Sequence, residues 1–358
     1  MSPRRARSLV TALIAHGREA GTPATAAARI SVAAFLSEVG FTVQEQPFEF
    51  NGGIYRAMPA AGALLMLMSL LEVPLLLRYS PPWGALGAFL AGTTVASIAA
   101  ASFLSGVAAS PRTRRDANLI AQRPGAVVHC WLVAHLDTKA QGHSMAGRLV
   151  ALWVTVMALV AMGAMAVLRL YGLLPVAAGV ATGVLGVLAG LLLIGGRLAG
   201  ETPGARDNGS GLLAVLTAAE VTSDTGIGII ITSAEEFGLA GARALVRERP
   251  ALFAGTEVLN VDTIDDDGTL FVVTHSPGNL LAGRVQERLA GLAPVRGRRL
   301  PLGIMVDGVP LATVAAGAVT IGRLSWGTLR RMHSPRDDAA GYAMVTAELL
   351  GERLAAAI

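Results

Sequence analysis

The chain has 358 residues, of which 53% are hydrophobic and only 15% are charged, whereas a typical soluble domain has about 25% charged residues. This composition excludes a disordered tail protein and argues against an ordinary cytosolic enzyme, and one cysteine excludes a disulfide framework or a cysteine-based zinc ribbon. The net charge of +4 comes from arginines beside apolar segments, so we interpret it as juxtamembrane charge and expect no nucleic-acid partner.

The first fifty residues have the pattern of a folded segment. Residues 8–40 show helical periodicity, and residues 41–50 alternate as a strand does. No apolar core precedes Met58, so we do not expect a cleavable signal peptide here.

Four stretches are apolar over the length that a membrane-spanning helix needs, about 20 residues. Short connections join them in pairs, which predicts two helical hairpins. Most of the flanking arginines lie on the side shared with both termini, so the positive-inside rule predicts that the rest of the chain is cytoplasmic. The predicted spans are residues 58–77, 83–109, 149–170 and 173–198.

Two features stand out within these spans. Glu72 and Pro74 interrupt the first span near its end, and we expect the carboxylate at the membrane interface rather than in a functional site. The fourth span carries Gly179, Gly183, Gly186 and Gly190, a small-residue stripe suited to close helix packing. So few polar residues argue against a transporter.

The remaining chain, roughly 250 residues, is long enough for one α/β domain. Residues 116–122 and 127–135 flank an Arg-Pro-Gly turn and are predicted to form a hairpin. Helices are then expected at 209–221, 239–248, 279–291 and 339–357, and strands at 226–232, 256–261 and 268–274. This alternation predicts a mixed, mostly parallel sheet flanked by helices.

Five polar motifs are expected at strand ends, where α/β enzymes place their sites. Each is weak alone, because a single histidine or an Asp-Asn-Gly-Ser-Gly turn usually has a structural role. Glu235-Glu236 is different, since it directly follows the buried run Ile229–Ala234, where a solvated face is implausible. Two histidines and several carboxylates suit zinc. The motifs are His135-Leu136-Asp137, Asp207-Asn208-Gly209-Ser210-Gly211, Glu235-Glu236, Asp262, and His333-Ser334-Pro335-Arg336-Asp337.

The order and spacing of these motifs resemble the dinuclear zinc aminopeptidases of clan MH, metallopeptidase family twenty-eight. That family also contains glutaminyl cyclases and inactive receptor ectodomains. The resemblance covers the non-membrane chain from about Asp116 onward, and more faintly from Ser8. The matching segments are Ala134–Asp137, Pro203–Gly211, Ala234–Gly241, Asn260–Asp262 and His333–Asp337.

The resemblance implies a zinc aminopeptidase-like fold with two Zn²⁺ ions. Carried over residue by residue, His135 and Asp262 would bind one ion, Glu236 and His333 the other, and Asp207 would bridge them. The ions would acidify a bridging water and polarise the scissile carbonyl.

Two further residues receive catalytic roles from the resemblance. Asp137 would accept a hydrogen bond from the second ring nitrogen of His135 and fix its tautomer. Glu235 would be the general base that passes a proton from the water to the leaving amine. The Asp207–Asn208 peptide is expected to be cis. Asp307 lies where relatives often have an Asp-His pair, but the histidine is absent, which leaves the substrate contacts there in doubt.

Both hairpins interrupt the catalytic domain, which is a large departure from the family. The predicted division is 1–57, 110–148 and 199–358 for the catalytic domain, and 58–109 and 149–198 for the hairpins. Both leave from the sheet edge that carries the metal ligands, so we expect the active site to face the membrane surface.

The leading interpretation is therefore a multi-pass membrane zinc metallopeptidase, an aminopeptidase that acts on peptide ends at or near the bilayer. Two alternatives stay open. One is a glutaminyl-cyclase-like or other amide-processing zinc enzyme, and a cyclase would need a single zinc. The other is a non-catalytic membrane scaffold with a peptidase fold. The four remaining histidines that we considered, His16, His129, His143 and His275, have no partner motif, although His143 could line the site.

Overall fold

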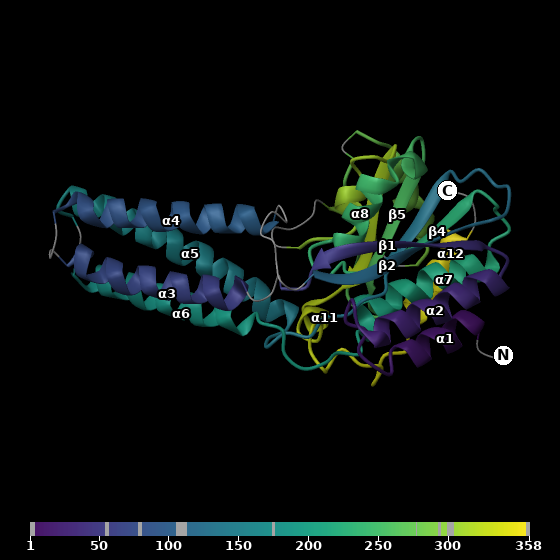
Figure 1. The fold of residues 1–358 in the computed structure, drawn as a ribbon, viewed down its shortest axis with the longest axis horizontal. Helices are drawn as coiled ribbons and strands as arrows, with labels where there is room; N and C mark the ends of the chain where they lie inside the picture. Colours follow the sequence, from purple (N-terminus) through teal and green to yellow (C-terminus); the bar gives the residue numbers. More distant parts are fainter. Residues whose placement is uncertain are drawn as a thin grey trace. The chain divides into compact units, whose positions relative to one another are not determined.

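The computed structural model describes residues 4–53, 57–77, 81–104, 113–173, 176–276, 278–292, 295–298 and 304–355 (Figure 1). The chain divides into two compact units, and each is described by itself. The sheet unit comprises Met1–Phe50, Thr113–Ala140 and Gly200–Ile358, and the helical unit comprises Asn51–Arg112 and Gln141–Ala199.

The described residues of the sheet unit form one eight-stranded sheet in the order β1-β2-β4-β3-β5-β8-β6-β7. Strand β3 runs parallel to β4 and β5, β5 to β8, and β6 to β7, whereas β2 is antiparallel to β4 and β6 to β8. The prediction of a mixed, mostly parallel sheet is thus confirmed. The strands are β1 (Thr42–Asn51), β2 (Thr113–Gln122), β3 (Cys130–His135), β4 (Ile227–Thr232), β5 (Glu257–Ile264), β6 (Thr269–Thr274), β7 (Val295–Arg298) and β8 (Gly317–Leu324).

The predicted hairpin between β2 and β3 is wrong. Strand β4 lies between them and pairs with both. All six β4 residues are buried, and an isoleucine-rich strand that is buried on both faces is stabilised most in the interior of a sheet. The direction of β2 relative to β3 is still antiparallel, because β2 is antiparallel to β4 and β4 is parallel to β3.

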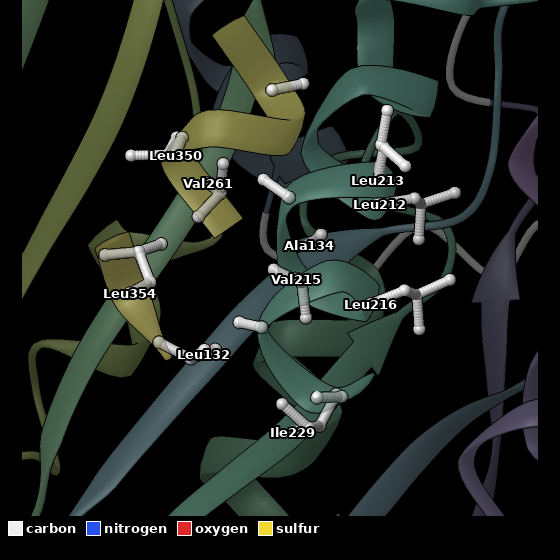
Figure 2. Packing of buried hydrophobic residues seen from close by; sticks show 14 of the residues in the cluster. Leu132, Ala134, Leu212, Leu213, Val215, Leu216, Ile229, Val261, Leu350 and Leu354 are labelled. Atoms are coloured by element: carbon white, nitrogen blue, oxygen red, sulfur yellow. The ribbon is translucent and has the colours of Figure 1, made fainter. Parts of the chain in front are cut away.

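Helices cover both faces of this sheet. Successive β3 side chains point to opposite faces: Leu132 packs in one apolar cluster, with α7 and α12, whereas Trp131 and Val133 pack in another, with α8 and η3. Figure 2 shows the first cluster, in which side chains of α7 and α12 gather with residues of β3, β4 and β5. The helices are α1 (Arg5–Leu13), α2 (Pro23–Glu38), η2 (Ala205–Ser210), α7 (Gly211–Val221), α8 (Ala240–Glu248), η3 (Pro250–Phe253), α9 (Leu281–Leu289), α10 (Gly308–Leu311), α11 (Trp326–Leu329) and α12 (Val345–Leu354).

The helical unit contains α3 (Ala57–Leu76), α4 (Trp83–Leu104), α5 (Met145–Leu170) and α6 (Val176–Gly195). The predicted glycine stripe of α6 packs closely against α3. A Cβ atom on Gly190 would lie 2.6 Å from the carbonyl oxygen of Gly62. A larger residue at position 190 would therefore push α3 and α6 apart. Glu72 is buried within this unit, at 2% exposure.

Among the described residues, three helices are long and apolar enough to cross a membrane, not four as predicted. They are Met58–Leu76, Met145–Leu170 and Val176–Gly195. The second predicted span does form a helix, α4, of which Trp83–Ile98 is the apolar part with described side chains. Residues 105–109 of that predicted span lie outside the described part of the chain.

Candidate metal centre

The predicted site residues gather at one edge of the sheet. His135 is the last residue of β3, and Glu235-Glu236 follow the end of the neighbouring parallel strand β4. Asp262 lies near the end of β5, on the other side of β3. The carboxyl ends of parallel strands meet at the same edge, so three motifs that are distant in sequence come together there.

Asp137 connects two of these strand ends. Its carboxylate accepts hydrogen bonds from the backbone N–H groups of Glu235 and Glu236, at 3.1 and 3.2 Å. Nδ1 of His135 lies 3.1 Å from the carbonyl oxygen of Asp137 and 3.7 Å from its carboxylate. Asp137 therefore occupies Nδ1 of His135, which leaves Nε2 for a metal, and it also fixes the Glu235-Glu236 turn.

Asp207 is held from two directions. The carboxylate of Asp337 accepts from the backbone N–H groups of Arg206 and Asp207, at 2.9 and 3.1 Å. The amide side chain of Asn208 accepts from the Thr263 N–H and donates to the Val261 carbonyl. These contacts tie the Asp207 loop to β5 and to the loop that carries His333. The Asp207–Asn208 peptide is cis, as expected.

Backbone irregularities aim the two remaining side chains. The register of β5 shifts between Val261 and Ile264, and such a bulge turns a side chain out of the regular alternation. Asp262 lies within this bulge. His333 has a φ of +62°, a conformation that non-glycine residues adopt rarely and mostly at turns.

All five predicted ligands come together in two groups that share Asp207. In each group one possible ligand atom per residue lies within 4.8 Å of the others. Oδ1 of Asp207 is 3.2 Å from Nε2 of His135, and Oδ2 is 3.2 Å from Nε2 of His333. The groups are His135, Asp207 and Asp262, and Asp207, Glu236 and His333. The two oxygens of one carboxylate thus face two different ligand sets, the arrangement of a bridging ligand.

The donor set fits two zinc ions. Imidazole nitrogens and carboxylate oxygens are zinc ligands, and all five residues are buried or nearly so. Isolated buried carboxylates are costly unless cations compensate them. Within the described residues, Lys139 is the only lysine or arginine in an ion pair with any of these ligands. Zinc binding by these residues stays a prediction, and the structure provides the geometry for it.

The two adjacent glutamates have different electrostatic environments. Burial and the neighbouring carboxylates Glu236 and Asp307 raise the pKa of Glu235 well above its usual value, despite the opposing effect of His135. Burial also acts to raise the pKa of Glu236, but His333 and Lys139 outweigh it and lower that pKa to about 2. Glu235 is therefore the better proton acceptor, and Glu236 the more permanent anion.

Two buried cations of the site were not predicted from the sequence. Lys139 contacts Glu236 directly. Arg18, in the segment between α1 and α2, donates to the carbonyl groups of Leu136 and Pro203, and so joins the loops that carry His135 and Asp207. The position of Lys139, four residues after His135, is a signal that the sequence offered. Arg18 had none, because its partners are backbone atoms.

The sequence and fold were compared with known proteins. Residues 190–294 match peptidase family M28. A glutaminyl cyclase from Porphyromonas gingivalis aligns over 98% of this chain and 94% of its own, with 17% identity and a TM-score of 0.56. The chain has the peptidase M28 fold. A leucine aminopeptidase precursor from Bacteroides thetaiotaomicron VPI-5482 aligns over 98% and 94%, with 13% identity and a TM-score of 0.58.

The M28 fold is thus shared with proteins of more than one activity. An aminopeptidase from Aneurinibacillus sp. strain AM-1 aligns over 98% of this chain and 91% of its own, with 13% identity and a TM-score of 0.56. No curated protein matches the chain. At these identities the comparison establishes the fold, and the activity has to be argued from the site.

The histidines without a partner motif have other surroundings. His129 pairs with Asp224, and Nε2 of His143 lies 2.9 Å from the Leu192 carbonyl within the helical unit. Nε2 of His275 lies 2.8 Å from the hydroxyl of Thr320.

His275 gives a testable pH dependence of stability. Burial lowers its pKa to about 4, whereas the unfolded value is about 6.5. The unfolded state therefore binds the proton more readily, and stability falls as the pH drops from about 6.5 to about 4. In a His275→Gln variant, we expect the fall in melting temperature between about pH 7.5 and pH 5 to be about 2–4 °C smaller than in the wild type, after discounting for partial exposure. An equal fall in both proteins, measured by thermal unfolding in detergent, would contradict this.

Proposed function

We propose that this protein is an integral-membrane zinc aminopeptidase. The observation that carries the proposal is the geometry of Asp207, whose two oxygens each lie 3.2 Å from a different histidine. A site with one metal position would need only one of these contacts. Two bound zinc ions would polarise the scissile carbonyl and acidify the attacking water.

The chain's own groups supply the remaining chemistry. Glu235 is buried beside the ligands and takes up a proton from the attacking water at a carboxylate oxygen. It then returns that proton to the leaving amine. Asp137 holds the Glu235-Glu236 turn by accepting hydrogen bonds from the backbone N–H groups of both residues. Glu235 therefore stays in place during the proton transfer.

The connectivity of the sheet supports a membrane topology with paired crossings. Strands β1 and β2 are neighbours in one sheet although α3 and α4 separate them in sequence. If α3 crosses the bilayer, the chain has to cross it again before β2, which assigns a crossing to the segment that contains α4. The same parity holds for α5 and α6, between β3 and β4. We propose that both termini and the sheet unit are cytoplasmic.

The chain enters and leaves the sheet unit near the candidate centre. Thr113 begins β2, which runs antiparallel to β3 and so starts at the edge where β3 ends. Ala140 follows His135 closely, and Gly200 precedes the Asp207 loop. We propose that this edge faces the bilayer and that the substrates are N-terminal ends of peptides that lie on or emerge from it.

Glutaminyl cyclase activity is the second candidate, because solved cyclases share the fold at the same level of similarity as the aminopeptidases. The complete second ligand group, Asp207, Glu236 and His333, favours the two-metal peptidase over it.

The test uses the full chain in proteoliposomes with its zinc content measured. One peptide is supplied free and with a C-terminal lipid anchor, and release of its N-terminal amino acid is followed. We expect release from both, at least about tenfold faster from the anchored form, and equal rates in detergent. Equal rates in liposomes would refute the membrane restriction. Ammonia release from an N-terminal glutamine peptide, with no amino acid released, would establish the cyclase instead.

A further inference from the structure

Lys139 is the only lysine of the chain; the other basic residues among the 29 are all arginine. It is 2% exposed, and its ammonium group lies 2.5 Å from Oε2 of Glu236. A buried ammonium is costly unless it is paired. This one is paired with a residue that is also a candidate metal ligand, so it forms part of the centre itself.

The contact divides the carboxylate of Glu236 between two partners. Oε1 lies 3.2 Å from Nε2 of His333, on the side of the ligand group, while Oε2 is held by Lys139. With Oε2 committed to the ammonium, Glu236 offers a metal one oxygen and a carboxylate charge that is already partly compensated.

The other ligand group has no such cation. Oδ1 of Asp262 lies 3.8 Å from Nε2 of His135 and accepts from the hydroxyl of Thr263, which is a neutral donor. Within the described parts of the chain, neither His135 nor Asp262 forms an ion pair with a lysine or arginine. The other buried cation of the site, Arg18, acts on Asp207, which both groups share, and on Asp137. Lys139 is therefore the cation that directly contacts a ligand belonging to one group alone.

We propose that Lys139 makes the group of Asp207, Glu236 and His333 the weaker of the two zinc positions. The proposal rests on the proposed function only in taking zinc as the ion, and it does not require peptide hydrolysis. A positive charge next to a divalent cation in a buried site repels it strongly, because little water screens the interaction. Zinc then fills the position of His135, Asp207 and Asp262 first. The second position fills only at higher free zinc, so the two-metal state depends on zinc supply.

The experiment is a zinc titration of the full-length, chelator-stripped protein in detergent, with Zn²⁺ as the only added ligand. We expect two binding phases in the wild type. Lys139→Met, which removes the charge and keeps most of the side-chain length, is expected to tighten the second phase at least about tenfold and to leave the first unchanged. Lys139→Arg, which keeps the charge, is the matched control and is expected to retain two separated phases. An unchanged second phase in Lys139→Met, with the first phase intact, would overturn the proposal.

A second measurement needs no variant and covers the case in which Lys139→Met does not fold. Growth with ¹³C,¹⁵N-lysine labels one residue in the whole protein, so the side-chain ammonium group of Lys139 gives a single ¹⁵N signal in the NMR spectrum. That signal is expected to shift mainly during the second zinc phase. A shift completed in the first phase, or two phases of equal affinity in the wild type, would overturn the inference. Zinc phases as expected without peptide hydrolysis would instead refute the proposed function alone.

Discussion

Replacement of Glu235 by glutamine is expected to lower kcat for peptide hydrolysis by about 10²–10⁴, the range that general acid–base catalysis contributes. Glutamine keeps the shape of the side chain but cannot take up the proton. The hydrogen bond from the backbone N–H of residue 235 to the carboxylate of Asp137 is unaffected. The geometry of the candidate ligands should therefore be preserved. The measurement is the rate of N-terminal amino acid release at saturating zinc, together with zinc per chain by elemental analysis.

The control for this variant is Glu257→Gln, which changes a partly exposed glutamate that pairs with Arg284 at the other end of β5. It should retain wild-type activity. A Glu235→Gln protein with normal zinc content and more than about a tenth of the wild-type rate would remove Glu235 from the role of general base.

Replacement of Asp207 by asparagine is expected to empty both zinc positions at once. Asparagine offers one oxygen and no charge, whereas the aspartate presents an oxygen to each histidine. At a free zinc concentration that fills both wild-type positions, zinc should fall from about two ions per chain to fewer than one, because each position depends on this ligand. The comparison variant is Asp262→Asn, which belongs to one group only and should cost about one ion. Equal losses in the two variants would show that Asp207 does not bridge.

The candidate site could be predicted well from the sequence because its motifs directly follow buried strands or occupy tight loops. His135 ends β3 and Glu235 follows β4, so a correct reading of those strands places them at one edge. Strand alternation and apolar runs are local properties, and the sequence displays them.

Pairing in the sheet is not a local property. Strand β8 lies in the interior of the sheet, between β5 and β6. Its apolar run between Gly317 and Gly322 is short and contains the polar Thr320, so the sequence shows no clear strand pattern there. The position of β4 between β2 and β3 depends on a comparison of strands that are distant in sequence, because the interior position goes to the strand whose burial on both faces stabilises the sheet most. Lys139 was missed for a related reason, since its partner Glu236 is distant in sequence.

The order of synthesis constrains how this protein folds. The sheet unit consists of three separate chain segments, and the ribosome completes α3 to α6 before it has made β4, β5 and β8. The apolar helices are therefore complete while β2 and β3 still lack the neighbouring strands β4 and β5. Asp207 and His333 can join His135 only after all four of these helices have been made. A nascent chain consequently holds no complete set of the five candidate ligands until His333, which follows the last strand, has been translated.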